Sequence, residues 1–438
     1  MNLTWVSCFM AAVVTYYLGL FAVSLFHRRP PQPCLDGPLV VVIVPARNEE
    51  LVIAETISSL LALEYHRYLV MVVNDNSTDA TGPIVAAAAA ASDGRVIAVE
   101  RSETAGGGKS ETLNFGFALL LSLLDRHDPR LDGAGPGDIV VGVVDADGRL
   151  DPQTLACVVP LFLDPRVGAA QTGVRIANFA DGVLTRLQDM EFVGFSCMVQ
   201  LARDRFGSVG LGGNGQFARL SALLDLGHAP WTPGALSEDL DLGLSLVQAG
   251  WRVRFCQRAY VAQQGLTTWR TLLRQRTRWI QGHYQCWTHL PALLTTRRVR
   301  MATRIDLALY LLLVTTVMVA SFSLTAGVAS ALGAFSVTNQ LLTDLPAGLA
   351  SRLIVLVVSA GPLLMLIFSY QRNAAEPLHL WEIPAYALAF TVYSYLWVSA
   401  TIGAWARIVL RRGSWAKTPR VRTTLDRPRT PVARAEVT

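Results

Sequence analysis

The chain has 438 residues, of which 52% are hydrophobic and only 16% are charged, with a formal net charge of +5. This apolar excess predicts that part of the chain lies in lipid. The basic residues gather at 297–304 and 407–434, beside apolar segments. They favour anionic lipid over nucleic acid as a partner, since the globular part has no basic stripe with interleaved aromatics. The six scattered cysteines lack the CxxC spacing of zinc sites and indicate a reduced cytosolic face.

The first predicted element is an apolar helix at the N-terminus. Residues 5–26 carry no charge and are long enough to span a bilayer. No Lys or Arg precedes them, whereas His27, Arg28 and Arg29 follow, so the positive-inside rule predicts an anchor whose C-terminal end faces the cytoplasm. A cleaved signal peptide is the alternative.

The body of the chain alternates between apolar runs and helical patterns. Four apolar runs are predicted to be buried strands, at 39–44, 68–74, 96–99 and 139–144. Helices are expected between them, at 50–63, 80–91 and 110–124. This order predicts an α/β fold with a doubly wound, mainly parallel sheet. Ligands of such sheets bind beyond the carboxyl ends of the strands, so the loops after the strands are expected to carry the chemistry.

Polar groups follow each of the first three strands. Pro45 and Glu49 follow the first, Asp75 follows the second, and a glycine run ending in Lys109 follows the third. A carboxylate at this edge can accept a hydrogen bond from a nucleoside, and glycines with a lysine can approach an anion. Each loop, taken alone, has an equally good structural explanation. Its polar groups could be acids in a first helical turn, helix caps or part of a plain connection.

The fourth strand ends directly in Asp145-Ala146-Asp147-Gly148. Carboxylates at i and i+2 on a strand end point to the same face. A bound Mg²⁺ or Mn²⁺ would compensate their charge, and such ions are typically shared with substrate phosphates. The alternative is a pair of solvated turn aspartates.

Two further motifs lie towards the C-terminus. Glu238 and Asp239 are expected at a helix start, where an acid either stabilises the helix dipole or acts as a general base for an acceptor hydroxyl. The run 275–279, Gln-Arg-Thr-Arg-Trp, contains Arg278 for a phosphate and Trp279 for stacking on a sugar. Because Arg and Trp also favour membrane interfaces, an interfacial anchor is the alternative for this run.

In this order and spacing, Asp75, Asp145-Ala146-Asp147, Ser237-Glu238-Asp239 and the run 275–279 resemble the D, DxD, TED and Q(Q/R)xRW series of family 2 glycosyltransferases. The resemblance is to the membrane-integrated branch with cellulose, chitin, hyaluronan and poly-N-acetylglucosamine synthases, and it covers about residues 38–300. Asn74 departs from the usual first acid of an Asp-Asp pair, and Ser237 departs from Thr.

The resemblance implies a GT-A fold with transmembrane α-helices, and a role for each matching residue. Pro45, Glu49 and Asp75 would contact the nucleoside of a UDP-sugar, and Lys109 its ribose or phosphates. Asp145 and Asp147 would hold the diphosphate through Mg²⁺ or Mn²⁺, with Arg278 beside it. Asp239 would be the catalytic base, next to Glu238. The acceptor would be bound by Gly213, Asn214, Gln275 and Trp279.

The expected enzyme is an inverting transferase that moves glucose or N-acetylglucosamine onto a growing polysaccharide and couples synthesis to export. The alternative is a non-processive transfer to a membrane lipid. Apolar segments at 305–333, 351–370 and 383–408 predict a multi-pass plasma-membrane protein, in which oligomers could complete a channel. Four single spans would put the basic tail outside, against the positive-inside rule, so one segment is expected to be interfacial or re-entrant unless the tail is an exception.

The expected organisation has five parts: an anchor and linker (1–37), a cytoplasmic catalytic domain (38–265), a motif segment with interfacial helices (266–304), membrane helices (305–410) and a basic tail (411–438).

Overall fold

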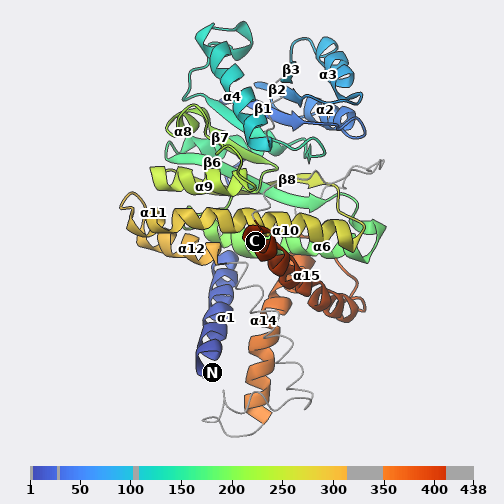
Figure 1. Cartoon of the computed structure of the whole chain (residues 1–438), viewed down its shortest axis with the longest axis vertical. Coiled ribbons are helices and arrows are strands. Elements are labelled where there is room, and N and C mark those ends of the chain that lie inside the picture. Colours follow the sequence, from blue (N-terminus) through green and yellow to red (C-terminus); the bar gives the residue numbers. More distant parts are fainter. Residues whose placement is uncertain (1–2, 27–29, 102–107, 313–348, 411–438) are drawn as a thin grey trace.

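The computed structural model describes residues 3–26, 30–101, 108–312 and 349–410. An α/β domain lies above a layer of long helices, and two helices project away from that layer (Figure 1). The expected tail at 411–438 and most of the segment expected at 305–333 lie outside the described residues.

A single mixed sheet of eight strands organises the domain, in the order β3-β2-β1-β4-β7-β6-β8-β5. The strands are β1 (Leu39–Ala46), β2 (Tyr68–Asp75), β3 (Val96–Arg101), β4 (Ile139–Val143), β5 (Arg149–Leu150), β6 (Val167–Ile176), β7 (Gln216–Arg219) and β8 (Arg252–Gln263). The first four strands pair in parallel, as predicted. Strand β7 then runs antiparallel to both of its neighbours, so the second half of the sheet is mixed.

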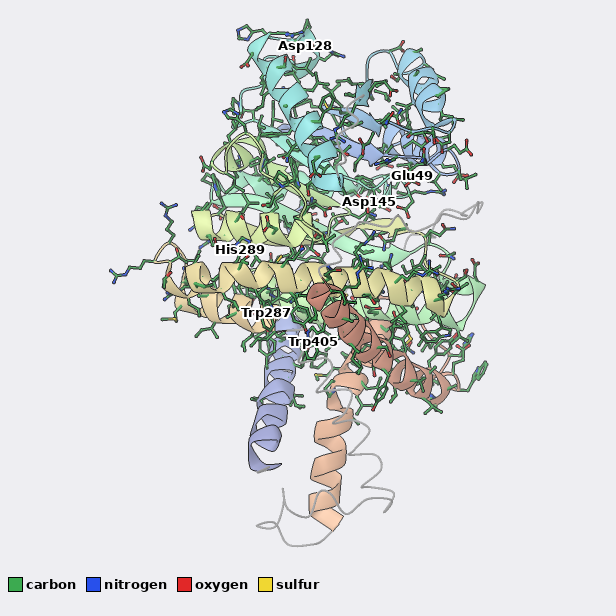
Figure 2. All side chains as sticks on the ribbon, in the orientation of Figure 1. Glu49, Asp128, Asp145, Trp287, His289 and Trp405 are labelled. Atoms are coloured by element: carbon green, nitrogen blue, oxygen red, sulfur yellow. The ribbon has the colours of Figure 1, made fainter. Side chains whose placement is uncertain are left out.

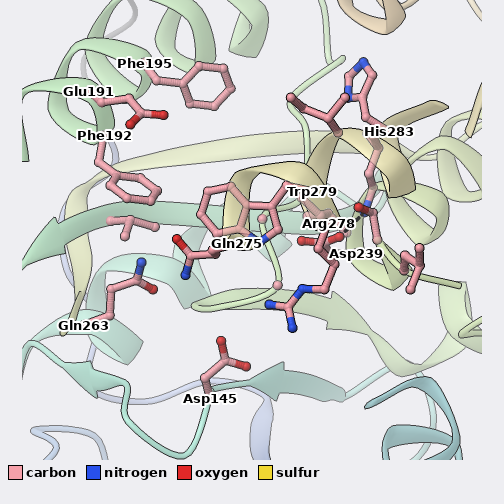
Figure 3. Close-up of a pocket in the computed structure, with 18 of the residues that line it drawn as sticks. Asp145, Glu191, Phe192, Phe195, Asp239, Gln263, Gln275, Arg278, Trp279 and His283 are labelled. Carbon is pink, nitrogen blue, oxygen red and sulfur yellow. Dashed lines mark hydrogen bonds between the residues drawn. The ribbon is translucent and has the colours of Figure 1, made fainter. Parts of the chain in front are cut away.

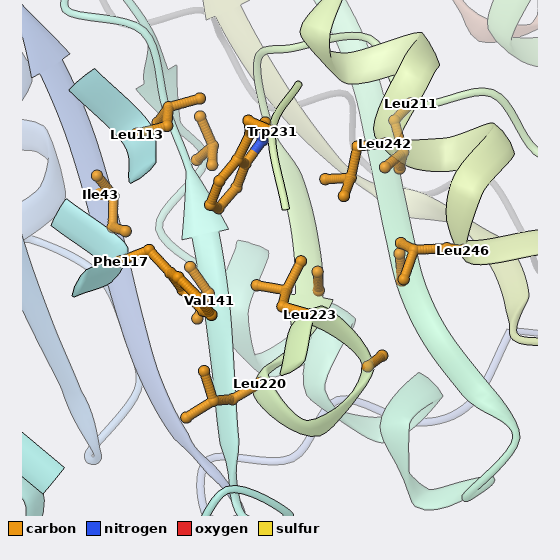
Figure 4. Packing of buried hydrophobic residues seen from close by; sticks show 14 of the residues in the cluster. Ile43, Leu113, Phe117, Val141, Leu211, Leu220, Leu223, Trp231, Leu242 and Leu246 are labelled. Atoms are coloured by element: carbon orange, nitrogen blue, oxygen red, sulfur yellow. The ribbon is translucent and has the colours of Figure 1, made fainter. Parts of the chain in front are cut away.

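The parallel strands are continuous apolar runs because both faces of the sheet are covered. Val41 and Ile43 pack into the core on one face, while Val40 and Val42 pack into the core on the other. Side chains alternate across a strand, so a strand buried on both faces has no polar positions. Figure 4 shows the first of these cores, where Phe117 packs near Ile43 and Val141.

The three predicted helices are present as α2 (Ile53–Leu61), α3 (Thr81–Ala90) and α4 (Lys109–Asp125). Helix α4 buries Leu113, Phe117 and Leu120, which lie on one face at helical spacing. The Phe117 ring meets the Trp231 indole edge-on, with centroids 6.0 Å apart. This packing places Lys109, the first residue of α4, at the carboxyl edge of the sheet.

The remaining helices complete the domain and its lower layer. They are α1 (Leu3–Leu25), η1 (Pro129–Leu131), α5 (Thr154–Val158), η2 (Val159–Leu163), η3 (Phe179–Asp181), α6 (Val183–Gly194), the π-helix η4 (Phe195–Gln200), α7 (Leu201–Asp204), α8 (Leu220–Leu224), α9 (Glu238–Ala249), α10 (Trp269–Gln285), η5 (Cys286–His289), α11 (Leu290–Thr295), α12 (Met301–Leu311), α14 (Leu349–Asn373) and α15 (Ile383–Val409). Helices α6 and α10 form the layer below the sheet (Figure 1).

Helices α1 and α14 pack together and project away from the domain, whereas α15 lies against α10 (Figure 1). Helix α1 coincides with the predicted anchor. Among the described residues, α15 alone is long and apolar enough to cross a membrane by length and composition. Because α15 packs on α10, it is the segment that best fits the expected interfacial position; a multi-pass topology stays a prediction.

A buried polar cluster ties α1 to the domain. One Asp306 oxygen accepts a hydrogen bond from the Tyr16 hydroxyl at 3.1 Å. The other accepts from Arg203 at 2.8 Å and from Ser208 at 2.6 Å. Since a buried charge needs partners, this cluster fixes where α1 enters the lower layer.

Aromatic rings mark the level at which α10 and α15 meet. The Tyr284 ring lies 5.0 Å from Trp287 and 6.3 Å from Trp405, between centroids. Figure 2 places both tryptophans at the lower side of the helix layer, well away from Glu49 and Asp145 at the sheet. Trp and Tyr are enriched at membrane–water interfaces. We therefore expect the membrane surface at the height of these rings.

Candidate active site

A cavity of about 560 Å³ opens at the carboxyl ends of β1, β2 and β4 and continues down to α14 and α15. Twelve of the thirteen predicted site residues line it. Figure 3 shows Asp145 on one side of this cavity, with Asp239, Arg278, Trp279 and Gln275 on the other. The lining residues among the predictions are Pro45, Glu49, Asp75, Lys109, Asp145, Asp147, Gly213, Glu238, Asp239, Gln275, Arg278 and Trp279.

Asp75 lines the sheet end of the cavity, where β2 ends. The Arg101 guanidinium contacts one Asp75 oxygen, and Arg47 lies 3.8 Å from the other. Sequence analysis missed both arginines. Asp75 and Arg101 are paired in the register of β2 and β3, so a cation ending the next parallel strand was the available signal.

The loop after β1 is held against the start of α3. The Glu49 amide donates to the Thr81 hydroxyl at 2.7 Å, and the Asn48 amide donates to Ser77 at 2.9 Å. Glu49 is buried at this position. These contacts fix Pro45 and Glu49 near Asp75 at the sheet end of the cavity.

Lys109 joins the strand-end acids to the helix-start acids. Its ammonium lies 2.5 Å from Asp145 and 3.2 Å from Glu238, and it donates to the Gly213 carbonyl at 3.3 Å. Burial alone lowers the pKa of Lys109, but the Asp145 and Glu238 carboxylates outweigh it and raise that pKa above its usual value. The lysine is therefore charged at neutral pH.

Asp239 lies in the first turn of α9, and its carboxylate accepts a hydrogen bond from the Leu240 amide at 2.8 Å. Burial, and then the Glu238 carboxylate, raise the pKa of Asp239 to about 7, while Lys109 opposes the rise. A carboxyl with this pKa suits a general base, because it is accessible in both protonation states near neutral pH.

Close backbone contact brings α10 to the start of α9. A Cβ on Gly282 would lie 2.2 Å from the Ser237 hydroxyl, so only glycine allows this approach. The Leu236 amide donates to Gln285 at 3.2 Å, and His289 pairs with Asp241 at 2.8 Å. Together these contacts hold Arg278 and Trp279 on the same side of the cavity as Asp239, across from Asp145 (Figure 3).

The glycine loop before β7 contains two neighbouring residues, Gly213 and Asn214, that were both predicted to bind the acceptor but take different positions. Gly213 has φ +73° and lines the cavity, where a Cβ would come within 2.9 Å of an Asp239 oxygen. Asn214 is buried behind the lining; its side chain accepts from the Asp145 amide at 3.2 Å and donates to Gln263 at 3.2 Å. Asn214 therefore supports the Asp145 loop, while Gly213 faces the site.

The predicted metal ligands fit a hard cation in part. Asp145 and Asp147 line the same cavity and offer carboxylate oxygens. Within the described residues, no group of three or more Asp, Glu, His or Cys side chains could hold a metal ion. Two carboxylates match the usual protein share of a Mg²⁺ or Mn²⁺ site, in which substrate phosphates and water supply the remaining ligands.

The lower end of the cavity is mainly apolar, although Thr391, Tyr393 and Ser394 of α15 also belong to the lining, and sequence analysis did not anticipate it. It lies between η4, α14 and α15, which are far apart in the chain. Residues that line this end are Phe195, Met198, Val199, Leu363, Leu366 and Phe390.

Residues 38–282 match the model of a family described as "Glycosyltransferase like family 2". The chain belongs to this family. The transferase is 33% identical over 316 residues to a beta-monoglucosyldiacylglycerol synthase of Nostoc sp., a match that covers 70% of this chain and 63% of the relative. Against the beta-monoglucosyldiacylglycerol synthase of Synechocystis sp., it is 34% identical over 312 residues, covering 68% and 61%. The matched region thus spans less than two thirds of these relatives.

A solved structure shares the fold. The transferase resembles the mannosyltransferase PcManGT from Pyrobaculum calidifontis, in complex with GDP-Man and Mn²⁺, with a TM-score of 0.54 at 18% identity. The match covers 92% of this chain and 99% of that one. The predicted GT-A fold and the assignment as a family 2 glycosyltransferase are confirmed.

The prediction of a polysaccharide synthase is wrong. The poly-beta-1,6-N-acetyl-D-glucosamine synthase of Staphylococcus aureus is only 25% identical over 287 residues, while the relatives at 33–34% are named as synthases of a glucosylated diacylglycerol. The expectation came from motifs assigned to the donor and the reacting hydroxyl, and motifs of that kind do not identify the acceptor.

Proposed function

We propose that this transferase moves glucose from UDP-glucose, with inversion, to the free hydroxyl of a membrane diacylglycerol. The observation that carries the proposal is the single cavity that runs from Asp145 and Asp239 to an apolar end between η4, α14 and α15. Glucose and the lipid acceptor are suggested by the names of the relatives at 33–34% identity.

The apolar end suits acyl chains better than sugar. Pockets that bind apolar ligands are lined mainly by hydrophobic side chains, with a few polar groups that set orientation. Here Leu363, Leu366 and Phe390 lie at the apolar end, and Gln275 and Asp239 lie higher in the cavity. A glycerolipid can therefore place its tails below and its hydroxyl beside the base.

The same layout supports association with a membrane. The exposed side of α15 carries Leu388, Val392, Ile402 and Trp405, each more than half exposed. Several exposed apolar side chains along one helix suit a membrane or protein contact. We infer that α1 and α14 extend into the bilayer while α15 lies at its surface, with the α/β domain in the cytoplasm.

The donor end would hold the sugar diphosphate among fixed charges. Asp145 and Asp147 would hold Mg²⁺ or Mn²⁺, which would neutralise charge on the leaving diphosphate. Lys109 and Arg278 line the same cavity and add positive charge from the protein itself. Asp75, held by Arg101, lies where the nucleoside would bind.

The transfer step needs one proton acceptor. Asp239 takes the proton from the lipid hydroxyl, and the oxygen attacks the anomeric carbon of glucose as the bond from that carbon to the diphosphate oxygen breaks. UDP leaves on the opposite side, so the configuration inverts. A positioned base of this kind contributes typically about 10²–10⁴-fold to the rate.

Product analysis tests the proposal. The purified full chain, with Mn²⁺ or Mg²⁺, would be given labelled UDP-glucose and dioleoylglycerol in phosphatidylcholine vesicles. The expected product is a single-sugar lipid that migrates with monoglucosyldiacylglycerol. A ladder of polymers, or sugar transfer that ignores the added lipid, would overturn the acceptor, and preference for another nucleotide sugar in a donor panel would overturn UDP-glucose.

A further inference from the structure

One fully buried guanidinium lies behind the cavity wall, on the face of α10 that the mechanism does not use. The Arg276 side chain is 0% exposed, and its Nη2 donates to a Glu191 oxygen at 2.8 Å. The Tyr393 hydroxyl donates to that same oxygen and lies 3.5 Å from the guanidinium. This network joins α10 to α6 and to the C-terminal helix α15.

Arg276 also supports the aromatic wall of the cavity. Its guanidinium carbon lies 4.1 Å from the centre of the Trp279 ring and 5.6 Å from the centres of Phe192 and Trp397. All three rings line the cavity, although Arg276 does not. A buried cation is attracted to the face of an aromatic ring. The arginine thus sets the position of rings on three different helices.

The same guanidinium decides which way the Gln275 amide faces. Arg276 Nη1 donates to the Gln275 side-chain oxygen at 2.8 Å. A guanidinium has donors and no acceptor, so Gln275 must present its oxygen to Arg276 and keep its NH₂ group for another partner. Gln275 lines the cavity, and Figure 3 shows its amide there between Phe192 and Trp279.

We propose that Arg276, held by Glu191 and Tyr393, is a positioning residue for the acceptor. It orients Gln275 so that the NH₂ group donates to an ester oxygen of the lipid glycerol, and it fixes the Trp279 indole beside the lipid hydroxyl. This inference rests on the proposed lipid acceptor. Diacylglycerol offers oxygen acceptors and a single hydroxyl donor, which Asp239 uses, so an amide donor is the group that its esters require.

If the ion pair between Arg276 and Glu191 were only structural, the expected effects of breaking it would differ. Its loss would lower the melting temperature and affect donor and acceptor alike. The positioning role predicts a selective rise in the KM for lipid, with the affinity for UDP and the slow release of UDP in the absence of lipid unchanged. The two roles are therefore separated by measuring both substrates.

The sharpest variant is Gln275→Glu, because a carboxylate keeps and strengthens the contact with Arg276 but removes the amide donor. Tyr393→Phe tests the network more gently, since it removes one hydroxyl and leaves the ring. Tyr386→Phe is the matched control, being the same substitution two turns earlier on α15 and outside the cavity lining. The assay uses dioleoylglycerol in phosphatidylcholine vesicles and UDP-glucose, with UDP affinity measured by calorimetry.

We expect Gln275→Glu and Tyr393→Phe to raise the KM for dioleoylglycerol about tenfold or more, as the loss of a hydrogen bond to or near a charged group does. Both variants should bind UDP with the affinity of the parent chain, and Gln275→Glu should keep the parent's melting temperature. Tyr386→Phe should change neither the KM for lipid, nor the UDP affinity, nor the melting temperature. An unchanged KM for lipid in Gln275→Glu, or an equal loss of UDP affinity, overturns the inference. If the parent chain makes no glucolipid, the proposed function fails instead.

Discussion

The Lys109 ammonium lies 2.5 Å from a carboxylate oxygen of Asp145. The same ammonium reaches Glu238 at 3.2 Å, so one side chain at the start of α4 links the end of β4 to the start of α9. In the absence of donor, this lysine balances acids that otherwise repel each other. The donor diphosphate would meet a cationic group already held in place.

Replacing this cation should weaken donor binding. We expect Lys109→Met to lower the affinity for UDP about tenfold or more, because a charge-assisted contact is lost. Calorimetric titration of UDP in the presence of Mn²⁺ measures this. Lys109→Arg should keep most of the affinity, and equal binding by Lys109→Met and the parent chain would contradict the expected role.

Activity should depend on pH through Asp239. The pKa of this group is raised to about 7, and a base must be deprotonated, so transfer should fall as the pH drops below about 7 and level off above it. Glu238 raises this pKa and Lys109 lowers it, while Tyr310 and Cys286 also interact with Asp239.

The sign of the Lys109 effect is testable in the same profile. The Lys109 ammonium lowers the pKa of Asp239. In Lys109→Met, the loss of transfer rate at low pH should therefore begin at a higher pH. The transfer rate at saturating lipid, measured from about pH 5 to about pH 9, shows where this loss begins. A shift to lower pH in this variant would exclude Asp239 as the titrating base.

Loss of the base itself should stop transfer and leave donor binding intact. Asp239→Asn keeps the size of the side chain and should slow glucose transfer by about 10²–10⁴-fold. Asp93→Asn, at a left-handed turn that Asn tolerates, is the control. Labelled glucolipid formation and UDP affinity are both measured, and unimpaired transfer by Asp239→Asn would refute the assignment.

Gly213 should be intolerant of a side chain for two separable reasons. Its φ of +73° makes alanine strained by roughly 1–2 kcal/mol, and the added Cβ would meet Asp239 at 2.9 Å. Gly227 has φ +105° and no neighbour within 4 Å of its Cβ position. Both Gly213→Ala and Gly227→Ala should lose stability in thermal melts through backbone strain, but only Gly213→Ala should lose transfer. Equal activity in the two variants would show that the contact with Asp239 does not matter.

Filling the apolar end should change which lipids are used. Leu366→Trp adds bulk to the cavity, whereas Leu364→Trp adds it at a side chain that is exposed on the same helix. We expect Leu366→Trp to slow transfer to dioleoylglycerol by about 10-fold or more while sparing dihexanoylglycerol. Similar behaviour of both variants towards both lipids would mean that acyl chains bind elsewhere.

The charged end of the cavity could be predicted from the sequence, because its side chains directly follow strands or begin a helix. Runs such as 39–44 and 69–73 are entirely apolar, which is typical of a strand covered on both faces. Parallel strands end at one edge, so Pro45, Asp75 and Asp145 had to converge whatever the rest of the chain did. The motif at 237–239 was likewise placed at a helix start, where α9 begins.

Only the tertiary structure decided how the rest of the cavity is built. Gly213 and Asn214 are neighbours in sequence, yet one faces the cavity and the other supports the Asp145 loop. The apolar end and the Arg276 network depend on how α6, α10 and α15 pack, and those helices are separated by up to two hundred residues. The charged end of the cavity is predictable from short motifs because its side chains directly follow strands or begin helices. The apolar end is enclosed by helices that are distant in the chain, and no short motif encodes its shape.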